Sequence, residues 1–89
     1  MGYIYETTNL KNGKKYIGLT NRESFDKAYL GSGKLIRLAI EKYGFNNFHV
    51  QPLEYHYNKE DLIEAEKRVI KERSANTSPN YYNIAEGGK

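Results

Sequence analysis

Two short segments near the N-terminus are rich in β-branched and aromatic residues, and a tight-turn signal separates them. Residues 3–8 and 15–20 have the composition of β-strands. Asn12 and Gly13 between them predict a two-residue hairpin turn, because both residues tolerate positive φ. The N-terminal part of the chain is therefore expected to form a β-hairpin.

The register of this hairpin decides how close its tyrosines come. A two-residue turn places Tyr16 opposite Asn9, so Tyr5 and Tyr16 point to the same face. They would then lie ~13 Å apart along the strand, at about 3.3 Å per residue. A bulge, or a wider loop starting near Leu10, would bring them closer.

Two later segments have the periodicity of amphipathic helices. The first covers residues 33–43, with Ser32 as its N-cap and Gly44 as its stop. Its apolar stripe contains Leu35, Ile36, Ala39, Ile40 and Tyr43. The second covers about residues 58–73 and begins at the capping residue Asn58.

The remaining segments complete a small mixed fold. Residues 48–57 predict a third strand, in which Pro52 indicates a bulge or an edge position. Residues 21–33 are the least regular stretch, and residues 81–85 predict a short extended segment. We expect one domain over residues 1–89, an α/β fold of the α+β sandwich type with a small three-stranded antiparallel sheet flanked by helices.

One carboxylate lies on the apolar side of the second predicted helix. Glu66 is four residues after Leu62, three before Val69 and four before Ile70. Burying a carboxylate costs several kcal/mol unless a cation or hydrogen bonds compensate. Glu66 is therefore either an edge glutamate paired with a nearby lysine or tyrosine, or a metal ligand, which the tyrosines of the hairpin favour.

Composition limits the classes of function. The formal net charge is +3 and the pI about 9.1, which suits a phosphate-bearing partner but equally a slightly basic soluble domain. The absence of cysteine excludes disulfides and zinc-thiolate sites. No apolar run approaches the ~20 residues of a membrane span, so we expect a cytoplasmic protein. His49 and His56, seven residues apart in one predicted strand, should face opposite sides, which argues against a histidine-metal site.

The order of these features resembles a known family. Tyr3-Ile4-Tyr5, Tyr16-Ile17-Gly18, the glutamate helix and Tyr82-Asn83-Ile84-Ala85 follow one another as in the catalytic module of phage homing endonucleases of the GIY-YIG nuclease family. The resemblance covers nearly the whole chain. Its first motif departs from the family, because Tyr3 stands where glycine is usual, or the glycine is shifted to Gly2.

The resemblance implies a metal-dependent DNA endonuclease with a GIY-YIG-like fold. Tyr5 and Tyr16 would then line the active site, with Tyr5 as general base and Tyr16 orienting water or phosphate. Glu66 would hold the metal, Mg²⁺ or Mn²⁺, and Asn83 would be the active-site asparagine. A single carboxylate can suffice for Mg²⁺, which keeps several of its waters.

Many family members also carry an arginine and a histidine ten to fourteen residues after the second motif tyrosine, and this chain has neither there. The window resembles that of a phage-type subgroup with a Tyr-X-Gly-Ser-Gly-Lys string. Tyr29 stands about where the histidine would be. Arg37 is the candidate for the missing guanidinium, although a solvated pair with Glu41 explains it as well. Arg68 and Arg73 are expected to face solvent or DNA.

Three classes of function remain open from the sequence: a nuclease, a catalytically degenerate nucleic-acid-binding module on the same fold, and an interaction domain. DNA is the expected partner, with backbone phosphate contacted by Lys14, Lys15, Lys27 and Lys34, for which a solvated surface is an equal explanation. Family enzymes usually append a separate recognition domain. A homodimer or a separate DNA-recognition partner would therefore be needed for selectivity.

Overall fold

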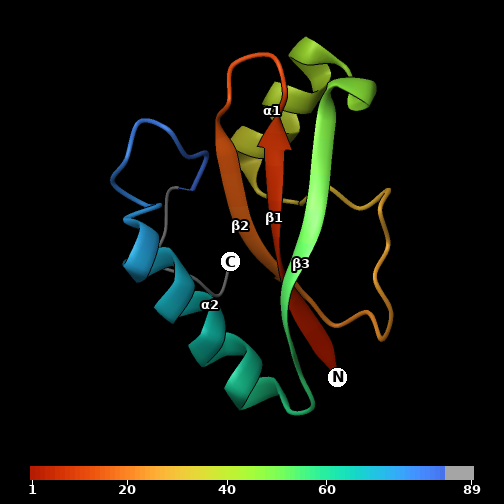
Figure 1. Ribbon diagram of the computed structural model, residues 1–89, viewed down its shortest axis with the longest axis vertical. Helices are drawn as coiled ribbons and strands as arrows, with labels where there is room; N and C mark the ends of the chain where they lie inside the picture. Colours follow the sequence, from red (N-terminus) through yellow and green to blue (C-terminus); the bar gives the residue numbers. More distant parts are fainter. Residues whose placement is uncertain (84–89) are drawn as a thin grey trace.

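A three-stranded antiparallel sheet carries one helix on each face. The computed structural model describes residues 1–83. In chain order its elements are β1 (Gly2–Asn9), β2 (Lys15–Thr20), α1 (Lys34–Tyr43), the 3₁₀ turn η1 (Phe45–Asn47), β3 (Phe48–His56) and α2 (Lys59–Arg73). The strand order is β2-β1-β3, so β1 is central (Figure 1). The fold class expected from the sequence is confirmed.

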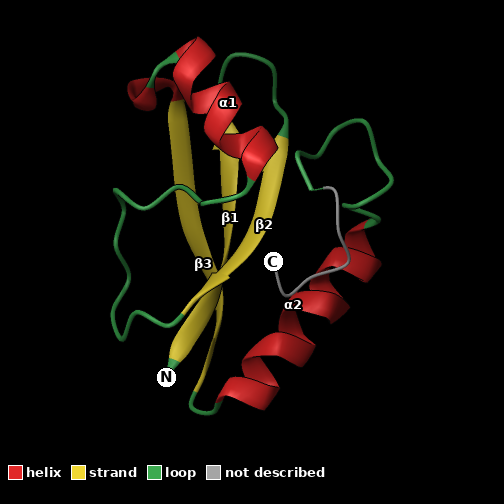
Figure 2. Ribbon diagram, turned by 180° about the vertical axis from the view of Figure 1, so that it is seen from behind, coloured by secondary structure: helices red, strands yellow, loops and turns green. Residues whose placement is uncertain are grey.

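The two faces of β1 bury different sets of side chains. Tyr3 and Tyr5 point to one face and pack in a core that includes Ile36 of α1. Ile4 points to the other face, where it packs in a second core that includes Leu62 of α2. Figure 2 shows α1 lying across the first face and α2 running beside the sheet along β2. Among residues 1–83, no helix is long and apolar enough to cross a membrane.

The hairpin loop is wider than a two-residue turn. The Asn9 backbone N–H donates to the Lys14 carbonyl at 2.8 Å, and the Gly13 N–H donates to the Asn9 carbonyl at 2.7 Å. Gly13 has φ +78°, which glycine adopts without strain. The Asn9 side chain accepts from the Lys11 N–H at 2.9 Å and fixes the start of the loop. The two-residue turn was therefore wrong, and the wider loop starting at Leu10 is confirmed.

This loop shifts the register toward a closer pairing of the tyrosines. Tyr16 lies opposite Thr7 instead of Asn9, and Tyr5 lies opposite Gly18. Opposite residues point to the same face, so Tyr5 and Tyr16 share the α1 face, as the sequence predicted. They are one diagonal step apart in the ladder.

Strand β3 is an edge strand with a bulge at Pro52, as predicted. Ile4 pairs with Glu54 and Tyr5 pairs with Pro52, so Leu53 is an extra residue on β3. Proline has no N–H to donate, and the outer position of β3 requires none there. The bulge reverses the alternation of β3, which turns Glu54 toward α2.

The bulge also changes the positions of the two histidines. His49 pairs with Thr8 and His56 with Gly2, two positions on the same side of β1. The prediction that they face opposite sides was therefore wrong, because it assumed an uninterrupted alternation. His56 contacts Glu54, with its Nε2 2.9 Å from a carboxylate oxygen.

The helix ends follow their capping residues. The side chain of Asn58 accepts from the Asp61 N–H at 2.8 Å, which confirms it as the N-cap of α2. α1 begins one residue later than predicted, with Gly33 rather than Ser32 as its N-cap and no side-chain cap bond. Of the predicted α1 stripe, Ile36 and Ala39 are buried, and Ile40 and Tyr43 are partly buried. Leu35 is 37% exposed.

The segment after α2 returns along the free edge of β2. The Lys15 N–H donates to the Asn80 carbonyl at 3.0 Å, and the Tyr82 N–H donates to the Lys15 carbonyl at 2.7 Å. Tyr81 forms a parallel bridge with Lys15. The extended segment predicted over residues 81–85 is therefore seen as far as residue 83, and its last two residues lie outside the described part.

Candidate active site

Three phenols meet on the α1 face of the sheet. The ring centroids of Tyr5 and Tyr16 are 6.2 Å apart, and those of Tyr5 and Tyr29 are 5.6 Å apart. Tyr5 belongs to β1, Tyr16 to β2, and Tyr29 to the loop between β2 and α1. The two motif tyrosines are thus far closer than the ~13 Å that a two-residue turn implies at about 3.3 Å per residue.

Gly18 makes room for the phenol of Tyr5. A Cβ atom at position 18 would lie 2.4 Å from the Tyr5 Oη and 2.5 Å from its Cζ. Both distances are far below the normal contact distance of about 3.5–4.0 Å between non-bonded carbons. The glycine of the second motif is therefore required by the close approach of the Tyr5 ring to β2.

Two further glycines surround the ring of Tyr16. A Cβ atom at Gly31 would lie 2.9 Å from the Tyr16 Cε2, and one at Gly33 would lie 2.9 Å from its Oη. Gly31 also has φ +133°, a conformation that other residues rarely adopt. The Gly33 backbone N–H hydrogen-bonds to the Tyr16 oxygen. The Gly-Ser-Gly segment before α1 therefore forms a close-fitting seat for this side chain.

The electrostatic environment keeps both motif phenols protonated at neutral pH. Burial raises the pKa of Tyr5 strongly, and Tyr16, Tyr29 and Glu66 raise it further. Burial also raises the pKa of Tyr16 to about 12, with Glu66 and Tyr29 adding to the increase and the Gly33 N–H opposing it. Of the two environments, that of Tyr16 opposes the ionised form less.

Glu66 is buried in α2, as the helical pattern predicted. It is 4% exposed and lies in the buried stripe with Leu62, Ala65 and Val69. Its charge raises the pKa of both Tyr5 and Tyr16, so the carboxylate is within electrostatic range of both phenols. Among residues 1–83, no group of three or more His, Cys, Asp or Glu side chains is placed to hold a metal ion.

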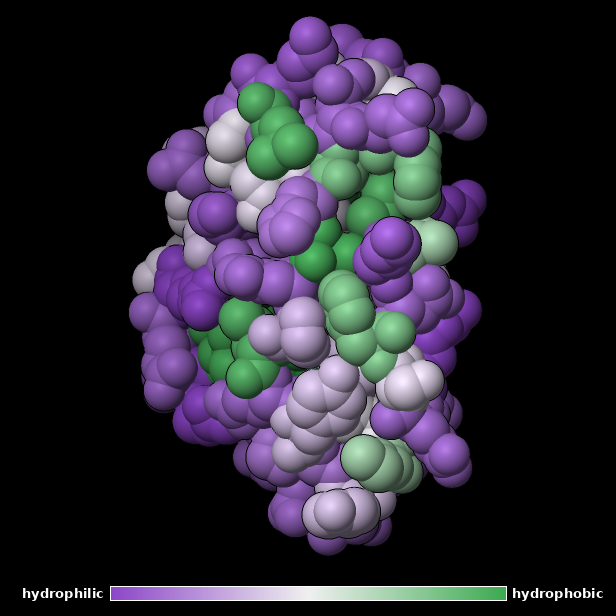
Figure 3. All heavy atoms as spheres, turned by 45° about the vertical axis from the view of Figure 1, so that its right-hand side comes forward, coloured by the Kyte–Doolittle hydropathy of each residue, from purple (hydrophilic) through white to green (hydrophobic). Residues whose placement is uncertain are grey.

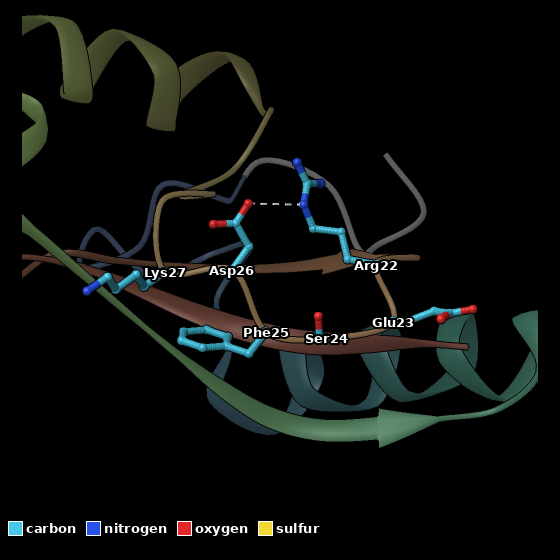
Figure 4. Close-up of a pocket in the computed structure, with 6 residues that line it drawn as sticks. All are labelled: Arg22, Glu23, Ser24, Phe25, Asp26 and Lys27. Atoms are coloured by element: carbon cyan, nitrogen blue, oxygen red, sulfur yellow. Dashed lines mark ion pairs between the residues drawn. The ribbon is translucent and has the colours of Figure 1, made fainter.

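The loop after β2 brings a guanidinium to the phenols. The Arg22 Cζ lies 4.2 Å from the ring centroid of Tyr29, a cation–π distance. Arg22 Nε is 3.4 Å from an Asp26 carboxylate oxygen, and Figure 4 shows these two side chains facing each other across the hollow of the loop. Arg37, the predicted guanidinium, is exposed on α1. Arg22 is therefore an arginine in contact with the phenol cluster, and the role of Arg37 stays a prediction.

Two other arginines, which were expected to face solvent or DNA, form ion pairs within the protein. Arg68 Nη2 lies 2.6 Å from a Glu54 carboxylate oxygen, and this pair lowers the pKa of Glu54. Arg73 pairs with the buried carboxylate of Glu6, and Lys15 Nζ is 3.9 Å from that same carboxylate. These cations are engaged on the α2 face of the sheet.

Asn83 acts on the backbone of β2. Its Oδ1 accepts from the Ile17 N–H at 2.9 Å and its Nδ2 donates to the Ile17 carbonyl at 2.8 Å. The amide thus pairs with Ile17 as a neighbouring strand would, directly beside Tyr16. This geometry fits a residue that positions β2 better than one that contacts a substrate.

The predicted DNA-contacting lysines have different surroundings. Lys27 and Lys34 are exposed, Lys27 on the loop in Figure 4 and Lys34 at the first position of α1. Lys14 lies 5.9 Å from the ring centroid of Tyr82. Lys15 donates to the Thr8 hydroxyl at 3.1 Å, besides its contact with the buried glutamate of β1.

Two features of the site escaped the sequence analysis. Arg22 lies outside the window in which the family arginine was sought, and its contact with Tyr29 depends on the path of an irregular loop. The seats of the two motif phenols depend on Gly18, Gly31 and Gly33. The string Gly31-Ser32-Gly33 was the available signal, since two glycines so close together indicate an unusual backbone or a close approach.

The fold and the site define the class of protein. The structure matches the solved catalytic domain of the intron endonuclease I-TevI with a TM-score of 0.75 and 29% sequence identity, covering 99% of this chain and 98% of that domain. The resemblance to the GIY-YIG nuclease family that the sequence indicated is confirmed. No family model matches it.

Its sequence relatives are phage endonucleases. The chain is 45% identical over 87 residues to the putative endonuclease segB of Enterobacteria phage T4, a match that covers 98% of this chain and 39% of the relative. It is also 45% identical over 86 residues to the putative endonuclease segE of the same phage, covering 97% of this chain and 42% of the relative. The chain thus spans about two fifths of the length of these relatives.

Proposed function

We propose that this chain is the catalytic domain of a metal-dependent DNA endonuclease that hydrolyses phosphodiester bonds. The observation that carries the proposal is the contact of two phenols, Tyr5 and Tyr16, whose pKa values are both raised by the buried carboxylate of Glu66. The match to a nuclease catalytic domain over its whole length supports the same conclusion.

The residues present fit a hard divalent cation such as Mg²⁺. Glu66 offers one buried carboxylate, and its charge acts on both motif phenols, which carry further oxygen atoms. Mg²⁺ commonly binds through one or two carboxylates plus substrate phosphate and retains several waters. When bound, the ion would supply positive charge that favours a phenolate and neutralises phosphate oxygens.

Tyr5 is the proposed general base, and its surroundings define what this role requires. A phenol whose pKa lies above its usual value of about 10 is protonated at neutral pH. Tyr5 can therefore take a proton from water only after losing its own, which positive charge nearby promotes. Arg22, stacked on Tyr29, adds such charge at the edge of the phenol cluster and could brace a phosphate oxygen.

Nicking of supercoiled plasmid DNA, with and without Mg²⁺, tests the proposal. Tyr5→Phe and Glu66→Gln should each abolish Mg²⁺-dependent nicking, while Tyr57→Phe, an exposed tyrosine elsewhere, should retain it. Calorimetric titration with Mg²⁺ should detect binding to the wild type and none to Glu66→Gln. Folded wild type that nicks no DNA with Mg²⁺ or Mn²⁺ would overturn the proposal.

One observation favours a second candidate, a nucleic-acid-binding domain that has lost catalysis. Burial and three neighbouring groups all raise the pKa of Tyr5, and each opposes its use as a base. The candidate predicts DNA binding that weakens with salt, without strand cleavage under any metal condition.

A further inference from the structure

A groove lies between the hairpin loop, the outer side of α1 and the segment that follows α2. Its volume is about 330 Å³, and the side chains that give it its character are Lys14, Leu38, Lys42, Tyr43 and Tyr82. We call it the α1 groove. None of the roles assigned above to the phenols, Glu66 or Arg22 uses these side chains.

The charged side chains that line the α1 groove, Lys14 and Lys42, are both positive. Lys14 stands on the hairpin and Lys42 on α1, so each wall contributes an ammonium group. Each ammonium lies over an aromatic ring, with Lys14 Nζ 5.9 Å from the Tyr82 centroid and Lys42 Nζ 5.3 Å from the Tyr43 centroid. Within the described part of the chain, no carboxylate lines this groove. The groove therefore attracts anions.

Three aliphatic side chains, those of Leu35, Leu38 and Ala39, also line the groove. Leu38 is 51% exposed, although it lies on the helix that covers the α1 face. Figure 3 shows, for one side of the molecule, hydrophobic side chains in separate patches among hydrophilic ones. Apolar and aromatic side chains between two cations suit a strand of nucleic acid, whose sugar rings and base faces pack on such side chains and whose phosphates are charged.

The groove and the candidate active site share neighbouring residues. Ala39, which lines it, belongs to the same buried cluster as Tyr5 and Tyr16. Tyr82 in its wall immediately precedes Asn83, which pairs with the backbone of Ile17 next to Tyr16. A strand that passes the motif phenols could therefore continue into the groove.

We propose that the α1 groove binds the sugar–phosphate backbone of the DNA strand that flanks the cleaved bond, with Lys14 and Lys42 each neutralising a phosphate. The proposal rests on the nuclease function proposed above. It adds a binding subsite that retains the strand on one side of the chemistry.

The test is DNA binding without metal, measured by fluorescence anisotropy with a labelled duplex as a function of salt. Lys42→Gln should weaken binding about five- to tenfold at about 50 mM salt and reduce the slope of log K against log salt by about one. Lys14→Gln should weaken binding and reduce the slope to a similar extent. The matched control is Lys59→Gln at the first position of α2, which removes the same charge and should change neither quantity appreciably.

The possible results separate the subsite from the nuclease function. Thermal unfolding checks that each variant is folded, and the same titrations on a Glu66→Gln background exclude any contribution of cleavage. If Lys42→Gln and Lys59→Gln changed the DNA affinity and its salt dependence equally, the proposed role of the groove would be overturned, whether or not the wild type nicks DNA. A loss of DNA affinity in Lys14→Gln and Lys42→Gln, but not in Lys59→Gln, would support the role of the groove. If the wild type in that case failed to nick DNA, only the nuclease function would be overturned.

Discussion

The close approach of the Tyr5 ring to Gly18 leads to a quantitative prediction. In Gly18→Ala the new Cβ would lie 2.4 Å from the Tyr5 Oη and 2.5 Å from Cζ, so the ring must move by about 1 Å to restore a contact near 3.5 Å. Tyr5 is 1% exposed and packs against the rings of Tyr3, Tyr16 and Tyr29, which leaves it little room.

Overpacking of this kind costs about 1–3 kcal/mol of the free energy of unfolding. For a domain of this size, 1 kcal/mol lowers Tm by about 4–8 °C, so Gly18→Ala should melt about 4–24 °C below the wild type. Nicking should fall more than stability alone explains, because the displaced phenol no longer lies beside Tyr16. Thermal unfolding by circular dichroism and plasmid nicking below the lower Tm measure the two effects separately.

Two controls isolate the clash. Gly13→Asn alters a glycine whose Cβ would meet nothing within 4 Å and whose positive φ asparagine tolerates, so it should melt close to the wild type. In a Tyr5→Leu background, which removes Cζ and Oη, Gly18→Ala should cost clearly less than it does alone. A Gly18→Ala protein with unchanged Tm and unchanged nicking would refute the reasoning.

Three further predictions concern other contacts of the site. Asn83→Ala removes both hydrogen bonds to Ile17 and should cost about 1–2 kcal/mol; faster hydrogen exchange of the Ile17 amide would show it, and unchanged protection would count against it. Arg22→Gln should slow nicking about tenfold or more, whereas Arg37→Gln should leave it nearly unchanged; the reverse order would restore the exposed arginine as the functional one. The pKa of Tyr16 is raised from 10.0 to about 12, so above pH 10 the unfolded state loses this proton first and stability falls as pH rises through that interval. Urea unfolding across this range should show a smaller loss for Tyr16→Phe, and an identical loss would contradict the assignment.

Several features could be predicted from the sequence because they depend on local patterns. The N-cap at Asn58 requires only an acceptor side chain before a helical segment, and it was found where predicted. The burial of Glu66 follows from its spacing to Leu62 and Val69 within one helix. The edge position and bulge of β3 follow from the missing N–H of Pro52.

Other features depend on groups that are distant in sequence or on small differences in loop geometry. The Asn12-Gly13 signal fits both a two-residue turn and the wider loop, and the choice between them moves Tyr16 by two positions along β1. The location of Arg22 over Tyr29 depends on the path of an irregular loop, which no periodicity describes. The exposed position of Arg37 on α1, by contrast, follows from helical spacing, which the sequence shows directly.

The hydrogen bonds that the segment after α2 makes along β2 have a consequence for self-association. An open strand edge is a template on which another chain can add, and sheet proteins need a means of preventing this. Here the edge at Lys15 and Ile17 is occupied by the protein's own backbone and by the Asn83 amide, while the opposite edge is interrupted at Pro52. Loss of the Asn83 contact should therefore make the domain more prone to strand-mediated aggregation at high concentration, a behaviour distinct from any effect on catalysis.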